Sequence, residues 1–258
     1  MNKDLVYEVM GRTALLTINR EEKRNALTQE MISDFLEYLD RVEGDDEVRA
    51  VCLTGAGEKA FCAGADLAGS LKGKDGNSPS GPERYATLLK RLSRFPKPLV
   101  ARVNGPCLAG GIGLMLSCDI VIAGNDTFFS TPEVNVGIFP MMVGALLLQN
   151  VTRKKAMEMV LTGRRVPAME AENMGLITRA VEPERLDEEV QKTLKLLISN
   201  SPTAIGMGKE AFRVMGGLPF DEAVDYLCRA LARVASTEDA KEGMKAFLEK
   251  RPPDFRGR

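Results

Sequence analysis

The most informative stretch of this chain is Ala60-Phe61-Cys62-Ala63-Gly64-Ala65-Asp66-Leu67. It follows an apolar run, Val48 to Thr54, that predicts a buried strand, and apart from Asp66 its residues are small or apolar. A second stretch of this kind, Leu108-Ala109-Gly110-Gly111-Ile112-Gly113, follows the apolar run from Pro98 to Val103. Small residues let a backbone N–H approach a ligand without a side chain in the way. Two such turns can offer two N–H groups to one oxygen atom, which is the arrangement of an oxyanion hole.

Composition sets the class of protein. A chain of 258 residues with 44% hydrophobic and 28% charged residues is long enough for one large α/β domain. Its net charge of −1 gives no reason to expect nucleic acid as a partner. No apolar run approaches the roughly 20 residues that span a bilayer, and the polar start, Met1 to Asp4, does not indicate a signal peptide. Five cysteines, mostly in apolar or glycine-rich contexts, predict buried reduced thiols, which suits the cytoplasm.

Strands and helices are predicted in alternation, as in a mostly parallel sheet. Leu5 to Val9 and Thr13 to Ile18 predict a hairpin, and apolar residues from Met31 to Val42 mark one face of a helix. From Val143 onward the strand signals nearly vanish. Further helices are expected over residues 85–95, 154–162, 167–174, 186–199, 202–215, 221–235 and 239–250.

The chain contains no histidine, which limits its chemistry. A Ser-His-Asp or Cys-His pair and a His-ligated zinc site are excluded, so a side-chain acid or base must be another titratable residue. Glu133 is the best candidate, because it lies in the apolar segment Phe128 to Val134, a setting that raises the pKa of a carboxyl group. The alternative interpretation is a surface carboxylate at the end of a strand.

The two glycine-rich turns belong to a longer series of motifs. Asn19-Arg20-Glu21-Glu22-Lys23-Arg24-Asn25-Ala26-Leu27 precedes them, Thr131-Pro132-Glu133 follows, and Ala246-Phe247-Leu248-Glu249-Lys250-Arg251 ends the series. In this order and spacing the motifs resemble the enoyl-CoA hydratase/isomerase family, also called crotonases, over nearly the whole chain. The resemblance implies an α/β fold: a spiral core of repeated ββα units, followed by C-terminal helices that build a trimer. We therefore expect a core domain over residues 1–200 and a C-terminal helical region over residues 201–258.

The resemblance also implies the roles of the central residues. The thioester oxygen of an acyl-CoA would lie between the backbone N–H groups of Ala65 and Gly110, and Glu133 would handle the α-proton of the acyl chain. At the position of Gly113, two-glutamate hydratases carry their second carboxylate, and here it is missing. Single-glutamate hydratases also exist, so an enoyl-CoA hydratase is the first expectation. An isomerase that moves a double bond between neighbouring carbons with one base is the alternative, and a weakly catalytic acyl-CoA-binding scaffold is a third.

The same resemblance predicts how the substrate is held. Coenzyme A arrives as part of the thioester substrate, and no other cofactor and no metal are implied. The expected assembly is a homotrimer or a dimer of trimers, with the last helix able to cover CoA, often from a neighbouring subunit. The acyl pocket itself could be shaped by Tyr85, Met141 and Met142. The residues that match CoA-lining positions are Arg24, Ala63, Asp66, Leu67, Phe247 and Lys250.

One motif points to a different class of protein. Gly55 to Ala60 fits the pattern G-x-G-x-x-A after a strand, which is typical of dinucleotide binding. That pattern should open a helix, yet the small residues from Phe61 to Gly64 follow it without a helical run. The expected acidic residue at the end of a second strand is also missing. An NAD-dependent enzyme is therefore not favoured.

Overall fold

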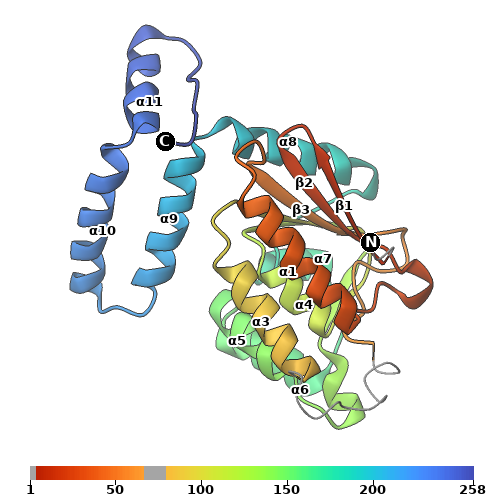
Figure 1. Cartoon of the computed structure of the whole chain (residues 1–258). Coiled ribbons are helices and arrows are strands. Elements are labelled where there is room, and N and C mark those ends of the chain that lie inside the picture. Colours follow the sequence, from red (N-terminus) through yellow and green to blue (C-terminus); the bar gives the residue numbers. More distant parts are fainter. Residues whose placement is uncertain (1–3, 67–79) are drawn as a thin grey trace.

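A computed structural model of the protein describes residues 4–66 and 80–258. Six strands form the larger sheet in the order β1-β2-β3-β4-β6-β9, with β1 and β2 antiparallel and the others parallel (Figure 1). The predicted hairpin is confirmed, and the predicted buried strands agree with β3 and β4 to within two residues. The bounds are β1 (Leu5–Met10), β2 (Thr13–Ile18), β3 (Ala50–Gly55), β4 (Leu99–Val103), β6 (Ile120–Gly124) and β9 (Arg179–Val181).

A smaller sheet contains β5, β7 and β8, with β5 and β7 parallel. Each step of the chain runs from a strand of the larger sheet to one of the smaller sheet and then to a helix: β4, β5, α4, and then β6, β7, η2. After β3, Cys62 bridges to Cys107 of β5, and α3 follows, so the same step occurs a third time. The repeated ββα unit that the family resemblance implies is confirmed. The bounds are β5 (Cys107–Leu108), β7 (Phe128–Ser130), β8 (Val166–Pro167), α4 (Gly110–Leu116) and η2 (Pro132–Val136).

The two faces of the larger sheet are covered by different helices. Successive side chains of a strand point to opposite faces. In β3, Val51 and Leu53 therefore join the main core with buried residues of α1 and α3, whereas Ala50 and Cys52 join a smaller core under α8. The side chain of Thr28 accepts a hydrogen bond from the Met31 N–H and caps α1, as its position predicts. These helices are α1 (Gln29–Glu43), α3 (Gly81–Ser93) and α8 (Leu186–Ser199).

One helix near the centre of the chain was not expected from the sequence, and the position of Glu133 differs from the alternative interpretation given to it. Helix α5 was not predicted, because Met141–Asn150 is apolar on nearly all sides and shows no helical period. Glu133 lies in the short 3-10 helix η2 rather than at the end of a strand. The other connecting elements are η1 (Glu21–Lys23), α5 (Met141–Asn150), α6 (Arg153–Thr162), α7 (Ala168–Asn173) and η3 (Pro183–Arg185).

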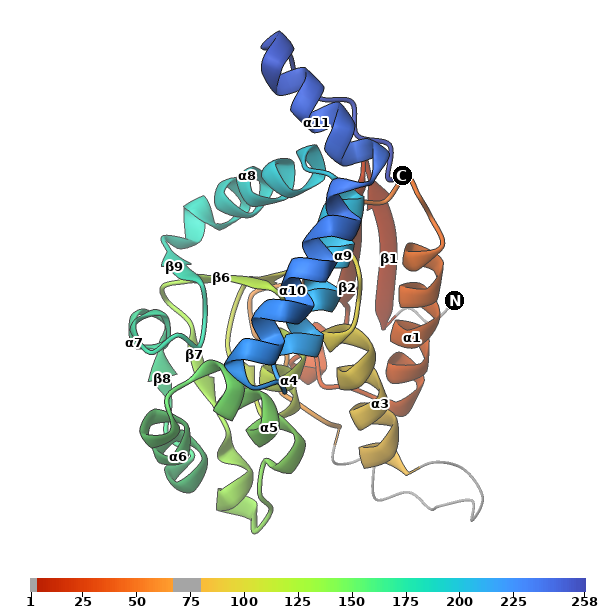
Figure 2. The same ribbon diagram turned by 90° about the vertical axis from the view of Figure 1, so that its left-hand side faces the viewer.

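The last three helices stand away from the sheets. Figure 1 shows α9 and α10 at the side of the molecule and α11 at its top, with the C-terminus beside α9, and in Figure 2 α9 and α10 lie in front of the sheets. These helices leave large apolar side chains exposed, among them Phe212, Phe220 and Phe247. Their bounds are α9 (Pro202–Met215), α10 (Phe220–Ala235) and α11 (Glu238–Glu249).

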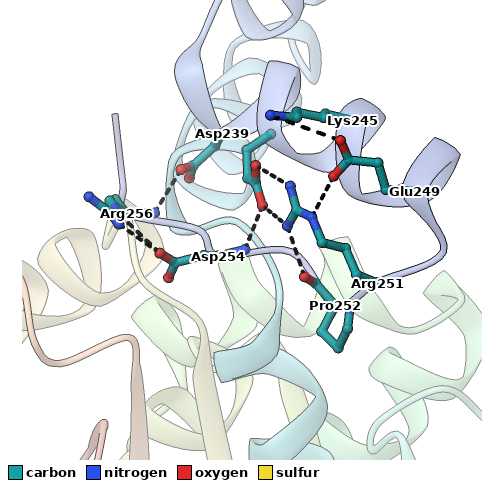
Figure 3. Close-up of polar contacts among 8 residues, drawn as sticks. Asp239, Lys245, Glu249, Arg251, Pro252, Asp254 and Arg256 are labelled. Atoms are coloured by element: carbon teal, nitrogen blue, oxygen red, sulfur yellow. Dashed lines mark hydrogen bonds and ion pairs between the residues drawn. The ribbon is translucent and has the colours of Figure 1, made fainter.

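Buried Asp239 at the start of α11 fastens the C-terminal tail (Figure 3). Its carboxylate accepts hydrogen bonds from the Ser201 hydroxyl (2.7 Å) and from the backbone N–H groups of Arg256 (2.9 Å) and Gly257 (3.1 Å). Burial alone would raise the pKa of Asp239, but these hydrogen bonds outweigh it and lower the pKa. The hydrogen bonds from the folded tail therefore stabilise the ionised form of Asp239.

The substitution Asp239→Asn is expected to lower the free energy of unfolding by about 1–3 kcal/mol at neutral pH, because one carboxylate oxygen becomes an NH2 donor and the donors that it faced lose their acceptor. A carboxyl with a lowered folded pKa stabilises the fold above its unfolded pKa, about 3.9 for Asp, and loses that contribution as pH falls through the folded value. Urea unfolding should therefore show a gap between parent and variant above about pH 4 that closes in more acid solution. The control is Asp254→Asn, whose exposed carboxylate pairs with Arg256; an equal loss in both variants would contradict the role of Asp239.

The five cysteines are free. Cys52, Cys62 and Cys107 are buried and Cys118 is half-buried, but Cys228 is exposed on α10, so the expectation of buried thiols is wrong for that residue. Burial raises the pKa of Cys52 and Cys62 to about 12. Within residues 4–66 and 80–258, no helix combines the length and apolar character needed to cross a bilayer.

Candidate active site

Three parallel segments, the one at Cys62 and strands β5 and β7, end on the same side of the smaller sheet, and the predicted catalytic residues follow them in the chain. The Leu108 N–H donates to the Cys62 carbonyl (2.8 Å), and the Ala109 N–H donates to the Ser130 carbonyl (2.9 Å). Because parallel segments end on the same side, the residues just beyond these contacts lie in neighbouring positions. Those residues are Ala65, Gly110 and Glu133.

The two glycine-rich turns touch each other at Gly64. A Cβ atom at this position would lie 2.7 Å from the Cβ of Ala109 and 3.0 Å from the backbone nitrogen of Gly110. Gly64 also has φ of +93°, a conformation that favours glycine. Glycine is thus required at position 64 for two reasons, and its presence lets the first turn pack directly on the second.

The backbone N–H of Ala65 is directed by a parallel bridge to Leu27. The Leu27 N–H donates to the Gly64 carbonyl (2.8 Å), and the Leu27 carbonyl accepts from the Asp66 N–H (2.8 Å). In this pairing Leu27 bonds to the residues on either side of Ala65, so the N–H of Ala65 points away from Leu27. Ala65 is exposed, as the predicted donor to a ligand has to be.

The second donor follows a strained residue. Ala109 has φ of 48° and ψ of −123°, a backbone conformation that costs a non-glycine residue about 1–3 kcal/mol. Gly110 is the first residue of α4, so its N–H belongs to the group that has no acceptor inside the helix. The pairing of Ala109 with Ser130 holds the strained turn in place and fixes the direction of the Gly110 N–H.

Glu133 is held by its neighbours in chain and space. The hydroxyl groups of Ser130 and Thr131 donate to the carbonyls of Gly163 (2.9 Å) and Met159 (3.2 Å), which anchors the segment before Glu133 to the end of α6. The Oε2 atom of Glu133 is buried and has no hydrogen-bond partner among the described residues. Burial raises the pKa of Glu133, although a backbone hydrogen bond opposes the shift. A carboxylate in this setting is suited to accept a proton.

Tyr85, a candidate for shaping the acyl pocket, makes a contact with α4 that the sequence did not indicate. Its hydroxyl donates to the Gly110 carbonyl (2.5 Å), and a Cβ atom at Gly113 would lie only 2.2 Å from the Tyr85 oxygen. Burial raises the pKa of Tyr85 well above its ordinary value, and the neighbouring charge of Glu133 adds to the shift. No local pattern could reveal this contact, because Tyr85 lies on α3 and meets α4 only through the fold.

Three of the six residues predicted to line a CoA site, Arg24, Ala63 and Asp66, lie around the first turn. The backbone carbonyl of exposed Arg24 accepts from the Ala63 N–H (3.0 Å), so these two positions are adjacent. Asp66 forms an ion pair with Arg20 (3.1 Å), a contact that the sequence did not predict. Leu67 lies outside the described residues.

Phe247 and Lys250 lie at the end of α11, well away from the rest of the predicted site. In both Figure 1 and Figure 2, α11 is far from α4, the helix that begins at Gly110. Phe247 is 83% exposed. A single chain therefore does not bring these two residues to Glu133. Among the described residues, no three His, Cys, Asp or Glu side chains gather as a metal site requires.

Comparison with known proteins defines the class to which this fold and site belong. The family described as enoyl-CoA hydratase/isomerase matches residues 9–258. The short-chain-enoyl-CoA hydratase of Clostridium acetobutylicum is 36% identical over 253 residues, which are 96% of this chain and 95% of the relative. An enoyl-CoA hydratase of Mycobacterium tuberculosis is 35% identical over 260 residues, 99% of this chain and 97% of the relative.

The fold comparison agrees. The crystal structure of enoyl-CoA hydratase from Bacillus anthracis has a TM-score of 0.93 to this chain at 30% identity, and the match covers 99% of this chain and 100% of the other. The protein therefore belongs to the enoyl-CoA hydratase/isomerase family, and it is an enzyme of that family.

Proposed function

We propose that the protein is an enoyl-CoA hydratase, which adds water across the 2,3-double bond of an acyl-CoA thioester with Glu133 as the base. The observation that carries the proposal is the buried Oε2 of Glu133, which has no hydrogen-bond partner within residues 4–66 and 80–258 and lies where the turns of Ala65 and Gly110 meet. The relatives compared above are named enoyl-CoA hydratases, which supports the same reaction.

The reaction follows from the placement of these three groups. The thioester oxygen accepts hydrogen bonds from the N–H groups of Ala65 and Gly110, each worth about 3 kcal/mol to the developing enolate. As the water oxygen bonds to C3, the electrons of the double bond shift to the thioester oxygen, and Glu133 takes a proton from the water. The enolate then collapses, and C2 takes that proton from Glu133. The carboxylate is regenerated and no other reactant is needed.

A second candidate reaction is supported by Gly113. Because this position carries no carboxylate, the site holds one glutamate where two-glutamate hydratases hold two. One base is sufficient to remove a proton from C2 of a 3-enoyl thioester and return it to C4, which moves the double bond to C2.

A panel of 2-enoyl-CoA and 3-enoyl-CoA substrates, assayed for both hydrated and isomerised products, tests the proposal. The hydratase assignment fails if no 2-enoyl-CoA is hydrated.

The C-terminal helices are proposed to assemble the enzyme. The division into a core, residues 1–200, and a helical region, residues 201–258, assigns the exposed Phe212, Phe220 and Leu231 to the second part. Apolar surface of this kind favours association, and the expected product is a homotrimer or a dimer of trimers. Assembly would let Phe247 of the partner subunit and Lys250 of the partner subunit cover the CoA that the first turn binds.

The free cysteines suit a reducing compartment such as the cytoplasm.

The rate of hydration should fall as the solution is made acid, because a protonated Glu133 cannot take a proton from water. Its pKa is raised, so the acid limb of kcat/KM against pH is expected above the ordinary glutamate value of 4.5. A circular dichroism spectrum at each pH separates loss of the base from loss of the fold. A limb at or below 4.5 in the folded enzyme would contradict the assignment of Glu133.

A further inference from the structure

The hydroxyl of Tyr85 occupies the space in which a side chain at position 113 would begin. A Cβ atom at Gly113 would lie 2.2 Å from the Tyr85 oxygen, far inside any normal contact, and 3.3 Å from the Cδ2 atom of Leu89. A carboxylate therefore cannot be added at Gly113 while Tyr85 keeps this position. The absence of a carboxylate at position 113 and the presence of Tyr85 are therefore linked: the Tyr85 oxygen lies where the side chain of a glutamate at position 113 would begin.

The hydrogen bond of Tyr85 determines what its oxygen can still do. The hydroxyl proton is donated to the Gly110 carbonyl at 2.5 Å. A phenol oxygen that donates its proton keeps acceptor capacity. Gly110 also supplies a proposed donor to the thioester oxygen, so Tyr85 contacts the residue that would hold the substrate. Ala109, the residue before Gly110, pairs with Ser130, and Glu133 follows Ser130 by three residues, so the base lies in the same neighbourhood.

We propose that the Tyr85 oxygen accepts a hydrogen bond from the water that adds to the substrate, and so takes over water positioning from the carboxylate that is missing at Gly113. This inference rests on the proposed hydratase function. One proton of the water points to Glu133, which removes it, and the other points to Tyr85, which leaves it in place. The water oxygen is thereby directed at C3, and no proton is transferred to or from the tyrosine.

The substitution Tyr85→Phe tests the role, because it keeps the ring against α4 and removes only the hydroxyl. We expect kcat for hydration to fall about 10- to 100-fold, the effect of a misplaced reactant, with KM for the enoyl-CoA nearly unchanged. Exchange of the α-proton of a saturated acyl-CoA in D2O needs Glu133 and the two N–H donors but no added water. We expect this exchange to continue at the parent rate. Tyr7→Phe, a change on β1, is the matched control.

Each other result overturns the inference. If Tyr85→Phe hydrated the enoyl-CoA at the parent rate, the Tyr85 hydroxyl would have no part in the reaction. An equal loss of hydration and of α-proton exchange would show that Tyr85 acts only by supporting Gly110. A parent enzyme that hydrates no enoyl-CoA would overturn the proposed function and this inference with it. If the parent hydrates an enoyl-CoA and Tyr85→Phe hydrates it equally fast, only this inference is overturned.

A second pair of variants approaches the same question from Gly113. The change Tyr85→Ala removes the obstructing oxygen, and the double variant Tyr85→Ala with Gly113→Glu then supplies a carboxylate in the cleared space. We expect the double variant to hydrate at least 10-fold faster than Tyr85→Ala alone, because the second acceptor for water is restored. A double variant that folds, binds CoA and is no faster than Tyr85→Ala would count against a shared role for these positions.

Discussion

Replacement of Glu133 by glutamine is expected to lower turnover by about 10²- to 10⁴-fold, the contribution of a positioned base. The amide has the size of the carboxylate but cannot take a proton from water. Because Glu133 is held through Ser130 and Thr131 rather than through its own side chain, the fold around it should persist. CoA affinity should also persist, since the proposed CoA contacts belong to other residues. Steady-state kinetics and a CoA titration measure the two quantities.

The chain contains a matched control for this variant. Glu184 also follows a proline in a short 3-10 helix, η3, but its side chain is exposed on the surface. The change Glu184→Gln removes the same charge from the same local structure and should leave turnover unaffected. If Glu133→Gln retained activity within a few-fold of the parent, Glu133 would have no place in the mechanism.

The parts of the site that could be predicted from sequence are those encoded locally. The turns that contain Ala65 and Gly110 and the apolar segment around Glu133 each combine a strand signal with a short run of small or proline residues. The structure shows why these three segments lie together: β5 and β7 are parallel neighbours, and Cys62 pairs beside them. In a fold of repeated ββα units, successive motifs lie on neighbouring strands. The family resemblance was therefore sufficient to expect these three segments side by side.

The features that could not be predicted depend on contacts between distant segments. The sequence suggested Tyr85 only as a possible pocket residue, and the packing of α3 on α4 reveals that it fills the space over Gly113. Asp239 looks like a residue in the first turn of a helix, and only the returning tail reveals its buried role. Helix α5 was missed for a different reason, since a segment that is apolar on all sides has no period to detect.

Replacement of Gly110 by proline is expected to lower turnover by about 10²- to 10³-fold, because proline has no N–H and one of the two donors to the thioester oxygen is lost. Proline is otherwise suited to the first position of a helix. The structure also leaves room for the Cβ atom of a residue at position 110, which would meet Tyr85 at 3.5 Å and Gly64 at 3.6 Å, both ordinary contacts. The loss should therefore fall on the reaction more than on the fold.

The control is Gly110→Ala, which adds a side chain at the same position but keeps the N–H. Alanine should retain turnover within a few-fold, and only proline should lose it, because the two variants differ in the donor. A circular dichroism spectrum and a CoA titration establish that the proline variant folds, since proline also restricts the strained Ala109. A folded Gly110→Pro enzyme with near-normal turnover would show that the thioester oxygen is held elsewhere. A crystal with bound acyl-CoA gives a direct measurement: that oxygen should lie about 2.7–3.1 Å from the nitrogens of Ala65 and Gly110.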